Sequence, residues 1–148
     1  MTGKTIRVEL RQQQDYRFDI TFGDDAPLLT SDEPAPLGTG LGPSPVQLLC
    51  AAVGNCLSDS LLFAFRKFKQ TPEPIQCSVT AEVGRNADNK LRVLTMTARI
   101  QMGVAASELD QVGHVLAQFE EFCTVTQSVR QGIPITVEVW DDAGVQLK

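Results

Sequence analysis

Four cysteines are the residues of this chain with the most informative chemistry. Cys50, Cys56, Cys77 and Cys123 are separated by 6, 21 and 46 residues. This spacing matches neither the C-x-x-C pairs of a zinc site nor a small scaffold stapled by disulfides. The thiols are therefore either buried and inert, or they include a catalytic pair.

The sequence offers few residues for a metal site or a phosphate-binding site. The single histidine, His114, has no partner at metal-binding spacing, and a three-histidine metal site is impossible. The chain contains no G-x-G-x-x-G or Walker sequence, and the Gly-Thr-Gly of residues 38–40 lacks the Lys-Ser/Thr of a phosphate cradle. We interpret residues 38–40 as a connecting loop and expect neither a cofactor nor a metal.

Composition and charge narrow the class of protein further. The 148 residues are 43% hydrophobic and 21% charged, which is typical of one globular domain spanning residues 1–148. The net charge of −5 argues against nucleic acid or an anionic membrane as a partner. No run of eighteen apolar residues and no secretory signal is found, so we expect a cytoplasmic protein that does not span a membrane.

Cys56 lies in the middle of a long predicted helix. Ser44 can cap this helix and Pro45 fits its first turn, and the pattern continues to about Lys69. Residues 48–57 are apolar or small on almost every side, which predicts a central, buried helix. One chain of this length offers few elements to cover such a helix, so we expect an obligate dimer.

Alternating apolar residues predict strands before and after the central helix. The expected strands cover residues 6–10, 16–22, a short piece at 28–29, 75–83, 91–104 and 133–140. A second helix is expected to begin at Ser107, with Cys123 at or just past its end and a short helix at 125–130. Strands that come in runs, as hairpins, indicate an antiparallel α+β protein.

Two segments resemble the OsmC/Ohr family. Residues 42–56, GPSPVQLLCAAVGNC, are similar to the family's central helix, with a capped Pro, a Leu pair, small residues and then a cysteine. Residues 122–132, FCTVTQSVRQG, resemble its second-cysteine segment. The resemblance implies an OsmC-like α+β fold, in which antiparallel sheets of two intertwined chains wrap around long central helices in a homodimer.

The resemblance also implies a reaction and roles for two cysteines. Cys56 would be the peroxidatic thiolate that reduces an organic hydroperoxide, and Cys123 would resolve the sulfenic acid as a disulfide. A dithiol, such as a lipoyl group or a thioredoxin-like protein, would restore the thiols. Cys50 and Cys77 are expected to be structural.

The Cys56 thiol needs a cation or hydrogen-bond donors nearby to ionise near pH 7, and the resemblance implies an arginine from the N-terminal strands. Arg17 in the second predicted strand is the first candidate, and Arg130 is the alternative. Typical family members carry a Glu just after the helix-starting Pro, where it orients the arginine, whereas this chain has Val46 and Gln47 there. Gln47 is the residue expected in that role. The competing hypothesis is a non-enzymatic dimer that binds a small apolar ligand or a partner protein in the interfacial pocket.

Overall fold

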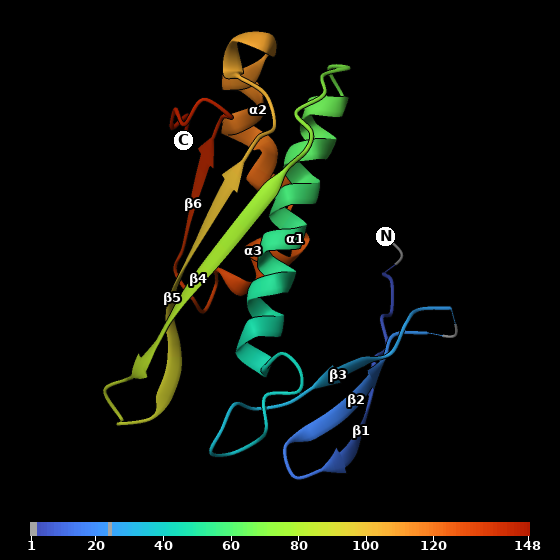
Figure 1. The fold of residues 1–148 in the computed structure, drawn as a ribbon. Helices are drawn as coiled ribbons and strands as arrows, with labels where there is room; N and C mark the ends of the chain where they lie inside the picture. Colours follow the sequence, from blue (N-terminus) through green and yellow to red (C-terminus); the bar gives the residue numbers. More distant parts are fainter. Residues whose placement is uncertain (1–2, 24) are drawn as a thin grey trace. The chain divides into compact units, whose positions relative to one another are not determined.

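The computed structural model describes residues 3–23 and 25–148 (Figure 1). The chain forms two compact units, Met1–Leu48 and Leu49–Lys148. The long helix α1 (Pro45–Arg66) begins in the first unit and continues through the second. The prediction of a long helix at this place is confirmed.

The first unit contains an antiparallel sheet of three strands, β1 (Glu9–Gln14), β2 (Arg17–Thr21) and β3 (Leu29–Ser31). The first strand lies later than the alternation at residues 6–10 predicted, and all of its residues are exposed. The turn explains this shift. Gln14 pairs with Arg17, and the two-residue turn between them uses Asp15 at a positive φ of 48°. Backbone pairing thus extends β1 through polar residues.

Helix α1 begins with a reciprocal capping box. The Ser44 N–H donates to Gln47 Oε1 at 2.9 Å, and the Gln47 N–H donates to Ser44 Oγ at 3.3 Å. The helix ends at Arg66, and Lys69 adopts a positive φ of 57° three residues later. Its predicted extension to Lys69 is therefore a turn, which a hydrogen bond from the Gln70 N–H to the Phe65 carbonyl closes.

The second unit contains the sheet β4 (Gln76–Arg85), β5 (Leu91–Gln101) and β6 (Ile135–Trp140). β4 and β5 form the predicted antiparallel hairpin, whereas β6 pairs with β5 in parallel. The prediction of purely antiparallel sheets is wrong at this strand. The connection from β5 to β6 carries helices and is long enough for the crossover that a parallel pair requires.

Four short helical segments form this crossover: η1 (Ala106–Glu108), α2 (Val112–Gln118), η2 (Phe119–Phe122) and α3 (Thr124–Val129). The second helix was expected to begin at Ser107, but only one 3₁₀ turn forms there because Leu109 returns to extended backbone. α2 begins after Gln111, which adopts a left-handed φ of 62°. The predicted short helix appears as α3.

The apolar core of the second unit lies between α1 and the β4-β5-β6 sheet, which run side by side in Figure 1. Every fourth residue of α1 from Val53 to Phe65 points into it, and Val53, Leu57, Leu61 and Phe65 are fully buried. The core partners on the strands and on α2 and η2 are Met96, Ala98, Ile100, Val115, Leu116, Phe119, Val137 and Val139.

The opposite side of α1 is open in one chain. Ala51, Ala52 and Asn55 are exposed, so the expected all-round burial is not reached within a single copy. By length and composition α1 could also cross a membrane, with a mean hydropathy of 1.7 over its most apolar window. The core helix of a soluble protein has the same composition, and the fully buried Val53, Leu57 and Leu61 place one side of α1 in a protein core.

Candidate functional site

Cys56 and Cys123 come together although 67 residues separate them in the sequence. Cys56 is half-buried in the middle of α1, and Cys123 is fully buried at the junction of η2 and α3. Backbone hydrogen bonds hold this junction, since the Cys123 N–H donates to the Glu120 carbonyl at 3.1 Å and the Gln127 N–H donates to the Cys123 carbonyl at 3.0 Å. The Cys56 thiol lies near enough to the Cys123 thiol for Cys123 to influence its ionisation.

The surroundings of Cys56 favour its neutral form. Burial raises the pKa of the Cys56 thiol, and the neighbouring Cys123 thiol raises it further, while the charge of Asp59 adds a small upward contribution. The backbone N–H of Val125, in the first turn of α3, acts in the opposite direction. Among residues 49–148 no basic side chain lowers this pKa. Within this unit the Val125 N–H is the one contribution that favours the Cys56 thiolate.

Cys50 and Cys77 lie away from this pair, at a separate pocket between α1 and β4. The pocket has a volume of about 460 Å³ and is lined by Cys50, Ala51, Gly54, Asn55, Ser58, Asp59, Cys77 and Val79. Burial raises the pKa of both Cys50 and Cys77, as it does that of Cys56. Cys77 occupies an apolar position in the strand pattern but is exposed, because β4 is an edge strand without any buried residue.

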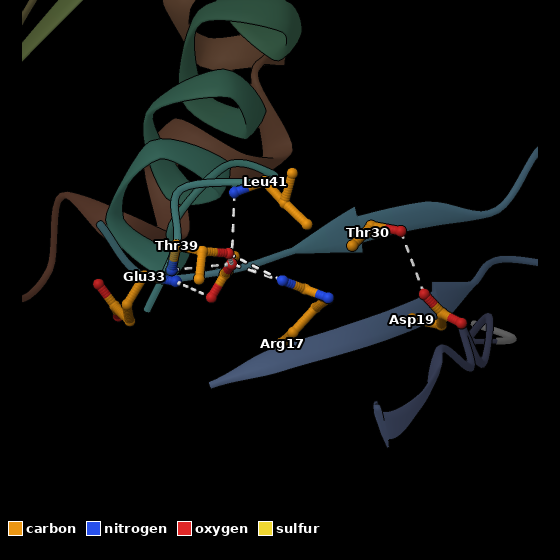
Figure 2. A network of polar contacts seen from close by, with 7 residues as sticks. Arg17, Asp19, Thr30, Glu33, Thr39 and Leu41 are labelled. Carbon is orange, nitrogen blue, oxygen red and sulfur yellow. Dashed lines mark hydrogen bonds and ion pairs between the residues drawn. The ribbon is translucent and has the colours of Figure 1, made fainter. Parts of the chain in front are cut away.

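Arg17 and a buried aspartate form the main charged cluster of the first unit. Arg17 on β2 places its Nε 3.7 Å from Oδ2 of Asp32, which follows β3 and is only 2% exposed. The Nη2 of Arg17 donates to Thr39 Oγ1 at 2.8 Å, and Thr39 Oγ1 donates to Asp32 Oδ2 at 2.8 Å. Figure 2 shows Arg17 on its strand reaching the loop that carries Thr39 and Leu41.

The loop after β3 is built around the Asp32 carboxylate. Besides the Thr39 hydroxyl, the backbone N–H groups of Glu33, Thr39 and Leu41 donate to it at 2.8, 3.2 and 3.3 Å. Burial raises the pKa of Asp32, but these hydrogen bonds outweigh it and lower the pKa from 3.8 to about 2. Asp32 therefore stays ionised at neutral pH.

A glycine in this loop permits the close approach. A Cβ on Gly38 would collide with Asp32 Oδ1 and with the Glu33 carbonyl oxygen. The Gly-Thr-Gly segment, interpreted above as plain connection, thus encloses a buried anion. The sequence held one signal for it, an Asp directly after a strand and six residues before a Gly-Thr-Gly, but that pattern does not name the arginine partner.

Gln47 and Arg130 do not take part in this cluster. Gln47 is engaged in the α1 capping box, and among residues 3–23 and 25–48 no hydrogen bond joins it to Arg17. Arg130 donates to Glu120 Oε1 at 2.7 Å and to the Ile135 carbonyl at 3.4 Å. Of the four predicted site residues, the structure brings Cys56 and Cys123 near each other. Arg17 is paired with the Asp32 carboxylate and not with Gln47.

A family model for OsmC-like proteins matches residues 38–138 of the chain, which include Cys56, Cys123 and Gln47. The chain belongs to the OsmC-like protein family. Arg17 and Asp32 lie outside the matched range. Among curated proteins, none matches this OsmC-like chain significantly.

Solved structures of OsmC-like proteins have the same fold. An OsmC-like protein of unknown function from Vibrio cholerae aligns with a TM-score of 0.78 at 17% identity, covering 93% of this chain and 99% of that one. An OsmC-like protein from Mycoplasma pneumoniae gives 0.77 at 16% identity, covering 95% and 99%. The organic hydroperoxide resistance protein OhrB of Bacillus subtilis gives 0.70 at 17% identity, covering 92% and 98%. At these identities the similarity establishes the fold alone.

Proposed function

We propose that this OsmC-like protein reduces organic hydroperoxides with Cys56 as the attacking thiolate and Cys123 as the resolving thiol. The observation that carries the proposal is the meeting of these two thiols from distant parts of the chain. The fold is shared with proteins named for organic hydroperoxide resistance, which supports the same chemistry here.

The proposed reaction balances with one hydroperoxide and two thiols. The Cys56 thiolate attacks the distal peroxide oxygen, the O–O bond breaks, and the alkoxide leaves as an alcohol after taking a proton. Cys56 is then a sulfenic acid, which the Cys123 sulfur attacks, forming the disulfide and releasing water. An external dithiol, lipoyl or thioredoxin-like, returns two electrons by thiol–disulfide exchange.

Arg17 is the cation proposed to lower the pKa of Cys56. The residues around Cys56 within 49–148 supply none, and Arg130 is already paired with Glu120. An opposite charge within about 4–6 Å lowers a thiol pKa by about 1–3 units. We therefore propose Arg17, rather than Arg130, as the source of this charge.

Depletion of free thiols tests this proposal. One equivalent of cumene hydroperoxide should remove two free thiols per chain and yield a disulfide-linked peptide containing Cys56 and Cys123. Survival of all four thiols in excess hydroperoxide would overturn it. Cys50→Ala and Cys77→Ala are the matched controls, and each should still lose two thiols.

A second candidate function is binding without catalysis. The pocket between α1 and β4, at about 460 Å³, has the size of a small-molecule site and does not include Cys56 or Cys123 in its lining. Tight, saturable binding of an apolar ligand with no thiol loss would favour this function over the peroxidase.

We also propose that the protein acts as a homodimer. The exposed small residues Ala51 and Ala52 on an apolar helix leave a side of α1 that a second copy would cover. Light scattering should report about twice the chain mass of 16.1 kDa. A monomer at micromolar concentration would contradict the dimer and leave the thiol chemistry to be tested separately.

A further inference from the structure

We propose that Asp32 is the positioning residue for Arg17, holding its guanidinium in a fixed orientation together with Thr39. The inference rests on the proposed function, in which Arg17 supplies the charge for the Cys56 thiolate. It assigns to a loop residue the role that the sequence placed at Gln47.

The first observation is that Asp32 is a buried charge with a complete set of partners. A carboxylate that is 2% exposed is costly unless it is paired and hydrogen-bonded. Three backbone N–H groups and the Thr39 hydroxyl supply these bonds, and Arg17 supplies the opposite charge. The carboxylate therefore occupies one rigid position, and whatever it contacts is held with it.

The second observation is the way in which Arg17 is bound. Its Nε faces Asp32 and its Nη2 is bonded to Thr39, while its side chain is 22% exposed. Within residues 3–23 and 25–48 the Nη1 group has no hydrogen-bond acceptor. A hydrogen bond thus holds Nη2, and the Asp32 charge attracts the buried Nε without a hydrogen bond, while Nη1 keeps its two N–H groups available for an anion.

The third observation is that Gln47 is unavailable for this task. Its Oε1 accepts the Ser44 N–H in the capping box, and its side chain is neutral. Holding a long arginine side chain in place beforehand spares the ordering cost that a thiolate or peroxide would otherwise meet. In this chain the carboxylate that does so comes from the loop after β3.

The pH dependence of Cys56 alkylation by iodoacetamide tests the inference, because only the thiolate reacts. Asp32→Asn should slow alkylation at pH 7 about tenfold and move the midpoint up by about one pH unit. Arg17→Gln should have a similar effect. The double variant should be no slower than Arg17→Gln alone, because Asp32 acts through Arg17.

Asp19→Asn is the matched control, since Asp19 accepts a hydrogen bond from Thr30 in the same sheet without touching Arg17 (Figure 2). It should leave the alkylation profile unchanged. Thr39→Val removes the hydroxyl that joins Arg17 to Asp32, and Thr39→Ser keeps it. This pair preserves the test if Asp32→Asn fails to fold, because Thr39→Val should shift the midpoint and Thr39→Ser should restore it.

An unchanged midpoint in Asp32→Asn and Thr39→Val, with circular dichroism showing a native fold, would overturn the inference. The inference would also be overturned if Asp32→Asn slowed Cys56 alkylation equally in the wild-type and Arg17→Gln backgrounds. Alkylation needs no hydroperoxide, so the two proposals fail separately. If Asp32→Asn does not shift the alkylation midpoint but the protein consumes hydroperoxide, the role of Asp32 is refuted. If Asp32→Asn shifts the midpoint but the wild type consumes no hydroperoxide, the peroxidase is refuted.

Discussion

The surroundings of Cys56 and of Asp32 shift the pKa of these two groups in opposite directions. Cys56 and Cys123 lie on or against an apolar core, and burial raises the pKa of Cys56. Asp32 is more deeply buried than Cys56, but dense hydrogen bonding lowers its pKa to about 2. Burial alone thus does not decide the charge of a group. The hydrogen-bond donors around the group also matter. Four donors reach the Asp32 carboxylate, whereas the Val125 N–H is the donor that favours the Cys56 thiolate.

This contrast gives the two regions complementary chemistry. In the proposed reaction the cysteine region supplies the nucleophile and the Arg17–Asp32 cluster supplies the cation. The following predictions test whether the regions depend on each other as the proposed reaction requires, and each uses one region as the control for the other.

The largest effect is expected from the thiols themselves. Cys56→Ser should abolish thiol loss to hydroperoxide, because it removes the attacking sulfur. Cys123→Ser should stop at a sulfenic acid on Cys56 after one turnover, which dimedone labelling and mass spectrometry would detect. Full turnover in Cys123→Ser, with its remaining thiols intact, would show that another group resolves the intermediate.

A large stability effect is expected in the core that carries Cys56. Phe65 is fully buried about two and a half turns after Cys56 on α1, and Phe65→Ala should lower the free energy of unfolding by about 3–5 kcal/mol. Phe63 is the matched control because it is 52% exposed and makes an edge contact with Phe122. Phe63→Ala should cost about 1 kcal/mol. Urea unfolding measures both, and equal losses would contradict the assignment of the core.

Sequence patterns predicted the parts of the molecule that depend on local spacing. The capping signal at Ser44-Pro45 located α1, and alternation located the β4–β5 hairpin. The parallel pairing of β6 was missed because alternation shows which residues face a core and not the direction of the neighbouring strand. The start of α2 was missed because Gln111 adopts a left-handed conformation that its residue type does not announce.

In the candidate site, too, the sequence predicted the residues with distinctive neighbours and missed a residue that depends on the folded loop. Cys56 and Cys123 stood out because their flanking segments are distinctive, and their contact follows from how η2 and α3 pack against α1. Asp32 was missed because its importance arises from the loop that folds back over it, through contacts with residues up to nine positions later. Such contacts leave no periodic pattern in the sequence.

A moderate, pH-dependent effect is expected from the Asp32 cluster. The folded-state pKa of about 2 lies below the ordinary value of 3.8, so its stabilisation is fully present above about pH 4. It is lost as the pH falls through about 2. Asp32→Asn should therefore be less stable than the wild type at pH 7, and this difference should shrink between pH 4 and pH 2.

Urea unfolding at several pH values measures that difference. Glu120 and Asp141 also have lowered pKa values, so both proteins lose some stability in acid, and only the difference between them reports Asp32. Asp19→Asn should run parallel to the wild type across this range. A constant gap between Asp32→Asn and the wild type down to pH 2 would contradict the ionised, hydrogen-bonded state of Asp32.

The smallest effect is expected at Gln47. Gln47→Glu keeps the acceptor of the capping box and adds a negative charge in the first turn of α1, which should stabilise the protein by about 0.3–1 kcal/mol. If Asp32 already holds Arg17, the added carboxylate should leave the pH midpoint of Cys56 alkylation unchanged in the wild-type background. In Asp32→Asn the same Glu could take over the arginine and move the midpoint back. A shift caused by Gln47→Glu while Asp32 is present would mean that Asp32 does not fully fix the position of Arg17. A carboxylate at position 47, in the first turn of α1, would then share the positioning of this arginine.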